Sequence, residues 1–265
     1  MSGYVAAVAL RAAAPEVPPE LEPASFTCQF LAPARFAPAR FEPVDIDVRV
    51  RRISRRAAAV AVSITQDAKP ILDAQSWFAL PSEVVQHDYA VPHPHGHPDD
   101  HPFISQLIDE PPPFPFWNNF EGKPIDWIED WDSYAGGPPE WAEWLRFVPT
   151  AAFADPVLEA ARLVLLADLP SFPAAVRAHP GPRTFVSPSL DLAVQLHRLD
   201  TTMTSGFTWL SRLVRWPCQY ESSSDVGRSG NLAQADAGIA RTEVGGIPPG
   251  GVGLLDVVHL RRRWR

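Results

Sequence analysis

The chain has 265 residues, of which 46% are hydrophobic, so it is long and apolar enough to bury one large core or two modest ones. Its net charge of −8 argues against a general nucleic-acid-binding protein, and no apolar run reaches the roughly 20 residues that a membrane-spanning helix needs. Cys28 and Cys218 cannot define a disulfide framework, which favours a reducing compartment and a cytoplasmic location.

The first 80 residues predict one helix followed by a set of strands. Residues 4–14 are rich in Ala, Val and Leu with no breaker before Pro15, which indicates a short buried helix. After this helix, apolar residues alternate with polar ones, the pattern of half-buried strands. The predicted strands cover residues 25–30, 44–51, 58–64 and 70–80. We expect consecutive strands to be antiparallel neighbours.

Residues 81–140 have the composition of a linker. They hold 12 of the 30 prolines, and 12 acidic residues against the single base Lys123. Six Phe and Trp side chains between 114 and 131 are nevertheless too many for a freely solvated segment. We therefore expect extended chain that is ordered around Trp117 and Trp127 and loose across residues 93–101.

The remaining residues, 141–265, repeat the order of the first 80. A strand is predicted over residues 141–148, and Asp155 supplies the N-cap of an apolar helix over 157–169. A strand over 185–197 follows, and the Trp-rich segment 207–216 is interpreted as its partner. The repetition indicates an internal duplication: two units of a helix and an antiparallel sheet, whose helices we do not expect to pack on each other.

Asp191 is the most informative single residue. Leu190, Leu192, Val194 and Leu196 fall on one face of its strand, whereas Asp191 falls on the other. Asp is depleted in strands and is rarely buried unpaired, so this carboxylate faces water, pairs with a donor or takes part in chemistry. On the pattern alone, the polar side of an ordinary alternation remains an alternative.

Several of these segments, in this order, resemble the thioesterase-like superfamily related to bacterial acyl-CoA thioesterase II. The resemblance is carried by Gly3-Tyr4-Val5-Ala6-Ala7-Val8-Ala9-Leu10-Arg11-Ala12-Ala13, Phe30-Leu31-Ala32-Pro33-Ala34-Arg35, the strand 55–66, Ser189-Leu190-Asp191, His197-Arg198 and Trp209-Leu210. It implies an α+β double hotdog fold with two central helices, each wrapped by an antiparallel sheet. The implied division is an N-terminal hotdog at 1–80, the acidic linker at 81–140 and a C-terminal hotdog with a divergent tail at 141–265.

The resemblance also implies an activity, the hydrolysis of an acyl-CoA thioester, which belongs to lipid metabolism. Asp191 occupies the position of the acid that activates water, and the reaction needs no covalent intermediate, metal or cofactor. Backbone N–H groups near Gly3 and Tyr4, or near Asp155 and Val157, are candidates to polarise the thioester oxygen. Gln234, a glutamine in the tail, is the candidate second catalytic residue.

Two departures from the family pattern keep a second hypothesis open. The N-terminal hotdog lacks its usual first strand, and the Ser- and Gly-rich segment 218–253 alternates weakly where the family has its last two strands. The alternative is thus a non-catalytic hotdog that binds acyl groups or a partner after losing its water site. A hotdog dehydratase is less favoured, and a homo-oligomer remains an option.

The remaining motifs give little support for a metal site, a nucleotide site or a serine nucleophile. Five histidines cluster in the linker, but no Cys lies nearby and a proline-rich loop gives poor support to a metal, so we expect none. The clustered histidines are His87, His93, His95, His97 and His101. Gly227-Arg228-Ser229-Gly230 lacks the lysine of a P-loop, and Ser187 and Ser189 lack a nucleophile elbow.

Overall fold

The computed structural model describes residues 2–37, 40–41, 43–81, 97–109, 115–148, 153–181 and 188–196, and the backbones of short strands at 208–213, 242–243 and 255–256. The helices are α1 (Ser2–Ala13), α2 (Pro156–Asp168) and α3 (Ser171–Arg177), and 3-10 turns lie at Ala14–Glu16, Pro98–Asp100, Ile104–Gln106 and Pro115–Asn119. The strands are β1 (Glu22–Phe30), β2 (Phe36–Ala37), β3 (Arg40–Phe41), β4 (Asp45–Ile53), β5 (Ala57–Gln66), β6 (Lys69–Ala79), β7 (Phe120–Pro124), β8 (Glu140–Phe147), β9 (Asp191–Leu196), β10 (Thr208–Leu213), β11 (Thr242–Glu243) and β12 (Leu255–Asp256).

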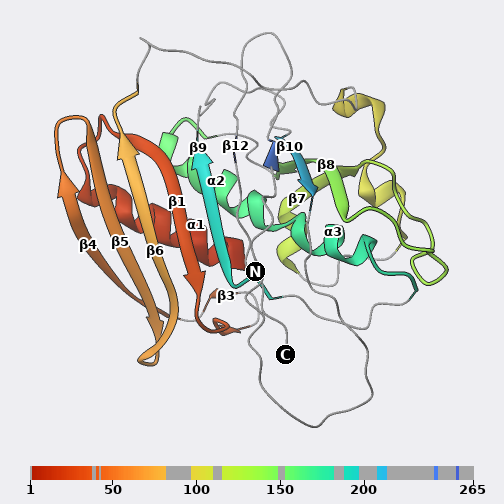
Figure 1. Ribbon diagram of the computed structural model, residues 1–265, viewed down its shortest axis with the longest axis horizontal. Coiled ribbons are helices and arrows are strands. Elements are labelled where there is room, and N and C mark those ends of the chain that lie inside the picture. The colour runs from red at the N-terminus through yellow and green to blue at the C-terminus, as the bar shows by residue number, and fades with distance from the viewer. Residues whose placement is uncertain are drawn as a thin grey trace.

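Six strands form the larger sheet, in the order β12-β9-β1-β6-β5-β4 with antiparallel neighbours (Figure 1). The predicted meander from β4 to β6 is confirmed. Asp67 and Ala68, both at positive φ, make the two-residue turn between β5 and β6. The expectation that β1 and β4 are neighbours is wrong, because β1 pairs with β6 and β9 instead.

The predicted partner of the 185–197 strand is also wrong. β9 pairs with β1 in the larger sheet, whereas β10 pairs with β8 and β11 in a second sheet of order β11-β10-β8-β7. Alternation of apolar residues indicates which face of a strand is buried, but it does not identify the strand alongside. As a result, β9, which belongs to residues 141–265, extends the sheet built by the first 80 residues.

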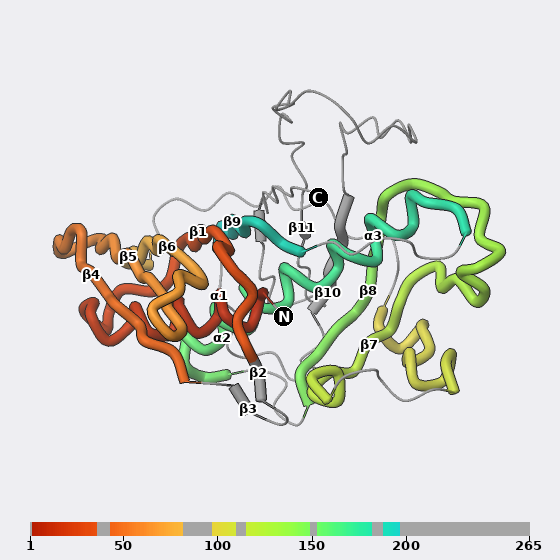
Figure 2. Tube along the Cα trace, turned by 90° about the horizontal axis from the view of Figure 1, so that it is seen from below, coloured from red at the N-terminus to blue at the C-terminus, as the bar shows by residue number. Residues whose placement is uncertain are grey.

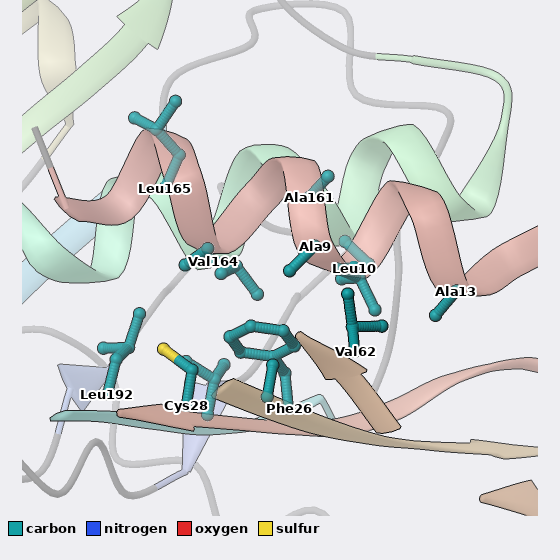
Figure 3. Close-up of a cluster of buried hydrophobic side chains, with 14 of the residues drawn as sticks. Ala9, Leu10, Ala13, Phe26, Cys28, Val62, Ala161, Val164, Leu165 and Leu192 are labelled. Carbon is teal, nitrogen blue, oxygen red and sulfur yellow. The ribbon is translucent and has the colours of Figure 1, made fainter. Parts of the chain in front are cut away.

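Both long helices lie on the same side of the larger sheet (Figure 2). They pack against each other as well as on the sheet, which overturns the expectation that they stay apart. Alanines at the contact allow the close approach, and Figure 3 shows Ala9 and Ala161 between the helices and the Phe26 ring beneath them. The shared core includes Val5, Ala6, Ala9, Leu10, Ala13, Phe26, Val62, Ala160, Ala161, Val164 and Leu192. A single hydrophobic core therefore joins the two units.

Aromatic contacts order much of the acidic segment. The Phe120 ring lies 4.9 Å from Phe116 and 4.7 Å from Phe147 between centroids, and Trp117 packs 5.9 Å from Phe120. Phe120 also begins β7, which pairs with β8. Trp127 stacks edge-on against Trp141 at 6.5 Å. These contacts agree with the expected order around the two tryptophans.

The histidine stretch is only partly described. Residues 93–96 lie outside the described residues, whereas 97–101 form a 3-10 turn that His97 caps by accepting from the Asp99 N–H. The described part of this stretch is thus ordered, contrary to the loose chain we expected.

Among the described helices, none combines the length and the apolar character needed to cross a membrane.

Gly3 marks the closest approach of the two helices, which leads to a prediction. A Cβ at this position would lie 2.6 Å from the Leu165 carbonyl oxygen, so Gly3→Ala should destabilise the fold by about 1–3 kcal/mol despite the better helix propensity of alanine. Urea unfolding followed by circular dichroism measures the change. Arg11→Ala, an exposed substitution on the same helix, should stay within about 0.5 kcal/mol of the wild type, and equal stability of the two variants would refute the tight contact.

Candidate active site

Asp191 is the first residue of β9, where the third part of the chain joins the N-terminal sheet. Its Cα partner on β1 is Gln29, and the Phe30 N–H donates to the Leu190 carbonyl at 2.7 Å. Leu192, Val194 and Leu196 are buried, as the alternation predicts, while Asp191 is half-buried. The carboxylate therefore stands at the edge of the core, within reach of solvent.

A second carboxylate, Asp168 at the end of α2, lies beside this strand. It is 8% exposed and accepts two hydrogen bonds: from the Gly3 N–H at 3.0 Å and from the Ser189 hydroxyl at 2.6 Å. Buried carboxylates require such partners. Asp168 thereby joins the start of α1, the end of α2 and the strand segment that carries Asp191.

The hydrogen bond from Gly3 shows that α1 begins where α2 ends. The positive end of the α1 dipole consequently faces the Asp168 charge, which favours this placement. The other suggested donor segment, at Asp155 and Val157, lies at the far end of a 13-residue helix, about 18 Å away at 1.5 Å per residue. Of the two candidate donor segments, the start of α1 is the one that lies at the Asp168 end of α2, through which it is linked to Ser189 and the start of β9.

Two of the four candidate backbone donors, the Gly3 and Val157 N–H groups, already have acceptors. Gly3 N–H donates to Asp168, and Val157 N–H donates to the Asp155 carboxylate at 2.8 Å, which confirms Asp155 as the N-cap. Use of the Gly3 N–H by a substrate oxygen would require exchange with the Asp168 carboxylate.

Cys28 lies under the same junction, on β1 opposite Leu192. Burial raises the pKa of the Cys28 thiol well above its ordinary value, and the Asp168 and Asp191 carboxylates raise that pKa further. Both carboxylates thus act electrostatically on the same thiol, which stays protonated at neutral pH. A protonated, buried thiol is a poor nucleophile.

Asp168 was not predicted from the sequence as a site residue. The signal was present, because Asp168 interrupts the apolar run from Leu163 to Leu169 just as Asp191 interrupts its strand. At the end of a helix, however, an acidic residue is easily taken for part of a solvated turn.

Gln234, the other candidate catalytic residue, lies outside the described residues. β11 and β12 do add short strands from the tail to the two sheets, beside β10 and β9. The described residues contain no group of three or more His, Cys, Asp or Glu side chains that could hold a metal ion.

Glu143, on β8 of the smaller sheet, is a second titratable group with an unusual environment. Its carboxylate packs over Gly122, where a Cβ would lie 3.6 Å from Oε2. Burial raises the pKa of Glu143 to about 7, and the opposing influence of the Trp141 side chain is smaller. Glu143 is thus substantially protonated in the folded protein at neutral pH.

Asp168 generates the first prediction of this site. Asp168→Asn removes the charge that the Gly3 N–H and Ser189 hydroxyl share, and should lower the free energy of unfolding by about 1–3 kcal/mol. Ser189→Ala removes one donor only and should cost less, about 1 kcal/mol. Thermal and urea unfolding measure both, and the reverse order of the two variants would contradict the role of Asp168 as the common acceptor.

Glu143 generates a prediction about pH. Because its pKa is about 7 when folded and near the ordinary 4.5 when unfolded, the folded state binds more protons between those values. The free energy of unfolding should therefore fall as pH rises from about 4.5 to 7, by up to about 3 kcal/mol from this residue. Glu143→Gln should flatten that fall in urea titrations, whereas Glu140→Gln, exposed on the same strand, should leave it unchanged.

Comparison with known proteins places the chain in a family. The family model for the acyl-CoA thioesterase N-terminal domain matches residues 2–79, and that for the acyl-CoA thioesterase C-terminal domain matches residues 90–217. A search of curated proteins finds no match.

Solved structures agree at the level of the fold. Acyl-CoA thioesterase II TesB2 from Mycobacterium marinum superposes with a TM-score of 0.68 at 18% identity, covering 99% of this chain and 89% of that one. A tesB protein of Mycobacterium avium subs paratuberculosis gives 0.64 at 21% identity, covering 98% and 85%. A conserved protein with a hot dog fold from Alicyclobacillus acidocaldarius gives 0.68 at 18% identity, covering 100% and 88%. These similarities confirm the α+β hotdog fold.

Proposed function

The chain belongs to the acyl-CoA thioesterase family, and from that premise we propose that it hydrolyses an acyl-CoA thioester with Asp191 as the general base. The observation that carries the proposal is the position of Asp191 at the β1–β9 junction, beside the start of α1. The products are a carboxylic acid and free CoA.

In the proposed reaction, Asp191 accepts a proton from a water molecule as the water oxygen bonds to the thioester carbonyl carbon. The resulting tetrahedral intermediate collapses with cleavage of the C–S bond. The CoA sulfur leaves with the electron pair and takes up the proton. No acyl-enzyme forms, in keeping with the protonated state of Cys28.

The surroundings of Asp191 support this role. The carboxylate is half-buried, so water reaches it while the neighbouring core lowers the local dielectric. The positive end of α1 lies nearby and favours negative charge that develops on the thioester oxygen. Because the Gly3 N–H is engaged by Asp168, the contribution of α1 in the unliganded protein comes from its dipole.

The engaged Gly3 N–H is also the observation that favours the alternative, a hotdog that binds acyl groups without hydrolysing them. A family member that had lost its water site would retain the fold and the apolar core. The two functions differ in turnover but need not differ in acyl-CoA binding, so both must be measured.

The test is thiol release from a panel of acyl-CoA thioesters of increasing chain length. Asp191→Asn should lower kcat by roughly 10²-fold or more with little loss of stability, because it removes the base and keeps the shape. Asp73→Asn is the matched control: Asp73 pairs with Gln29 from the opposite side, on the exposed part of the same sheet, and its loss should change kcat less than threefold or so.

Two outcomes would decide against the proposal. Wild-type turnover by a folded Asp191→Asn protein would remove Asp191 from the mechanism. Acyl-CoA binding by the wild type without thiol release on any substrate would establish the binding protein instead. Gln234→Ala, assayed in parallel, tests whether the tail contributes a catalytic residue.

A further inference from the structure

The candidate site holds two acidic residues, Asp168 and Asp191, that are joined through one serine. Asp168 is 8% exposed, and its oxygens accept from the Gly3 N–H and the Ser189 hydroxyl. Ser189 lies two residues before Asp191, so their Cα atoms are at most about 7 Å apart. The charge of Asp168 is thus held on the order of 10 Å from the Asp191 carboxylate.

Both charges act on one point of the core. Cys28 lies on β1 opposite Leu192, and after burial the Asp168 and Asp191 carboxylates both raise the pKa of its thiol. The two like charges therefore share an environment that water screens incompletely, and each makes ionisation of the other less favourable.

The start of α1 has the opposite influence. Its positive end favours negative charge nearby and would make Asp191 a weaker base. The first turn of α1 carries no acidic side chain, and Tyr4 is its one titratable residue. The Gly3 N–H of this turn donates to the Asp168 carboxylate. Asp168 therefore offsets part of the positive end of α1 where that end approaches β9.

We propose that the fixed charge of Asp168 raises the proton affinity of Asp191 and so makes Asp168 a positioning residue for the hydrolysis proposed above, on which this role rests. A carboxylate with an ordinary pKa of about 3.9 is a weak base at neutral pH. A general base becomes more effective as its pKa approaches the working pH. A second carboxylate held nearby raises the pKa of the base, provided that the second one stays ionised.

The neighbouring strands supply no comparable buried charge among the described residues. On β1, the groups beside Asp191 are Gln29, which is uncharged, and the protonated Cys28. Asp73 on β6 pairs with Gln29 from the other side, which places it two strands from Asp191, about 10 Å between Cα atoms. Asp73 is exposed, so water screens its charge.

The other elements that pack on β9 are α2 and β12. The one base of α2, Arg162, lies six residues before Asp168 and is paired with Glu159 in the core. On β12, Asp256 pairs with Gln195, four residues along β9 from the catalytic position and about 13 Å away. Asp168 is thus the buried charge among these groups that is tied to the start of β9.

NMR titration measures the proposed influence directly. In protein labelled with ¹³C at the aspartate carboxyl carbons, Asp191→Asn identifies the Asp191 signal. Asp168→Asn removes the charge and keeps the shape, so it should lower the pKa of Asp191 by about 0.5 to 1 unit. Asp73→Asn is the matched control at a similar distance on exposed surface, and it should lower that pKa by less than about 0.2 unit.

The pH dependence of hydrolysis gives a second measurement. The acidic limb of kcat/KM reports the pKa of the base in the free enzyme. In Asp168→Asn this limb should move to lower pH by the amount that NMR gives for Asp191. A residue that only places β9 would change kcat but would leave the limb where it is in the wild type.

Two results would overturn the proposed role. The first is an equal Asp191 pKa in the wild type and in Asp168→Asn, with both shown to be folded by circular dichroism. The second is a wild-type Asp191 pKa below about 3.9, which would mean that the positive end of α1 prevails. The wild-type value decides the matter if Asp168→Asn does not fold, because a value above 3.9 or so supports the role.

The NMR titration needs no turnover, so the two proposals fail separately. A shifted Asp191 pKa in a protein that releases no thiol from any acyl-CoA would reject hydrolysis and retain the influence of Asp168. Thiol release with an unshifted pKa would reject the influence of Asp168 and retain hydrolysis.

Discussion

The arrangement of the site depends on a carboxylate buried between two helix ends. Asp168 stands at the C-terminus of α2, where the dipole of its own helix disfavours negative charge. Three features offset this cost: the Gly3 N–H at the start of α1, the positive end of the α1 dipole and the Ser189 hydroxyl. Because an unpaired buried carboxylate would be costly, the helices can meet in only one direction, with α1 beginning where α2 ends. The absence of a Cβ at Gly3 permits the contact.

Further consequences follow along the strand. Ser189 is held by Asp168, so the start of β9 is placed relative to the helices, and pairing with β1 then places Asp191 beside Gln29. The same pairing sets Cys28 opposite Leu192, where burial, and after it the Asp168 and Asp191 carboxylates, raise the pKa of the thiol. The hydrogen bond of Asp168 to Ser189 thus places the start of β9. This placement leaves Asp191 at the edge of the core and the Cys28 thiol buried and protonated.

The apolar runs and the capping residue in the sequence predicted the two long helices well. The helices expected at 4–14 and 157–169 are Ser2–Ala13 and Pro156–Asp168, and the N-cap at Asp155 was identified correctly. The choice of strand partners was not predictable, because β9 and β10 have similar apolar patterns and only the tertiary packing separates them into different sheets. β7 was missed, since Gly122 and Pro124 are poor strand residues, and its place depends on pairing with β8 and on the ring contacts of Phe120.

Of the two carboxylates at the candidate site, only Asp191 could be predicted from the sequence. An acidic residue in an apolar strand is conspicuous, whereas Asp168 in the last turn of a helix is not, although the two act electrostatically on one thiol. Their environments separate their roles. The Asp168 carboxylate is buried, and its two oxygens accept from the Gly3 N–H and the Ser189 hydroxyl. Asp191 is half-exposed at the strand's first residue, where a water molecule can reach it. Of the two carboxylates, Asp191 is therefore the one that we propose as the general base.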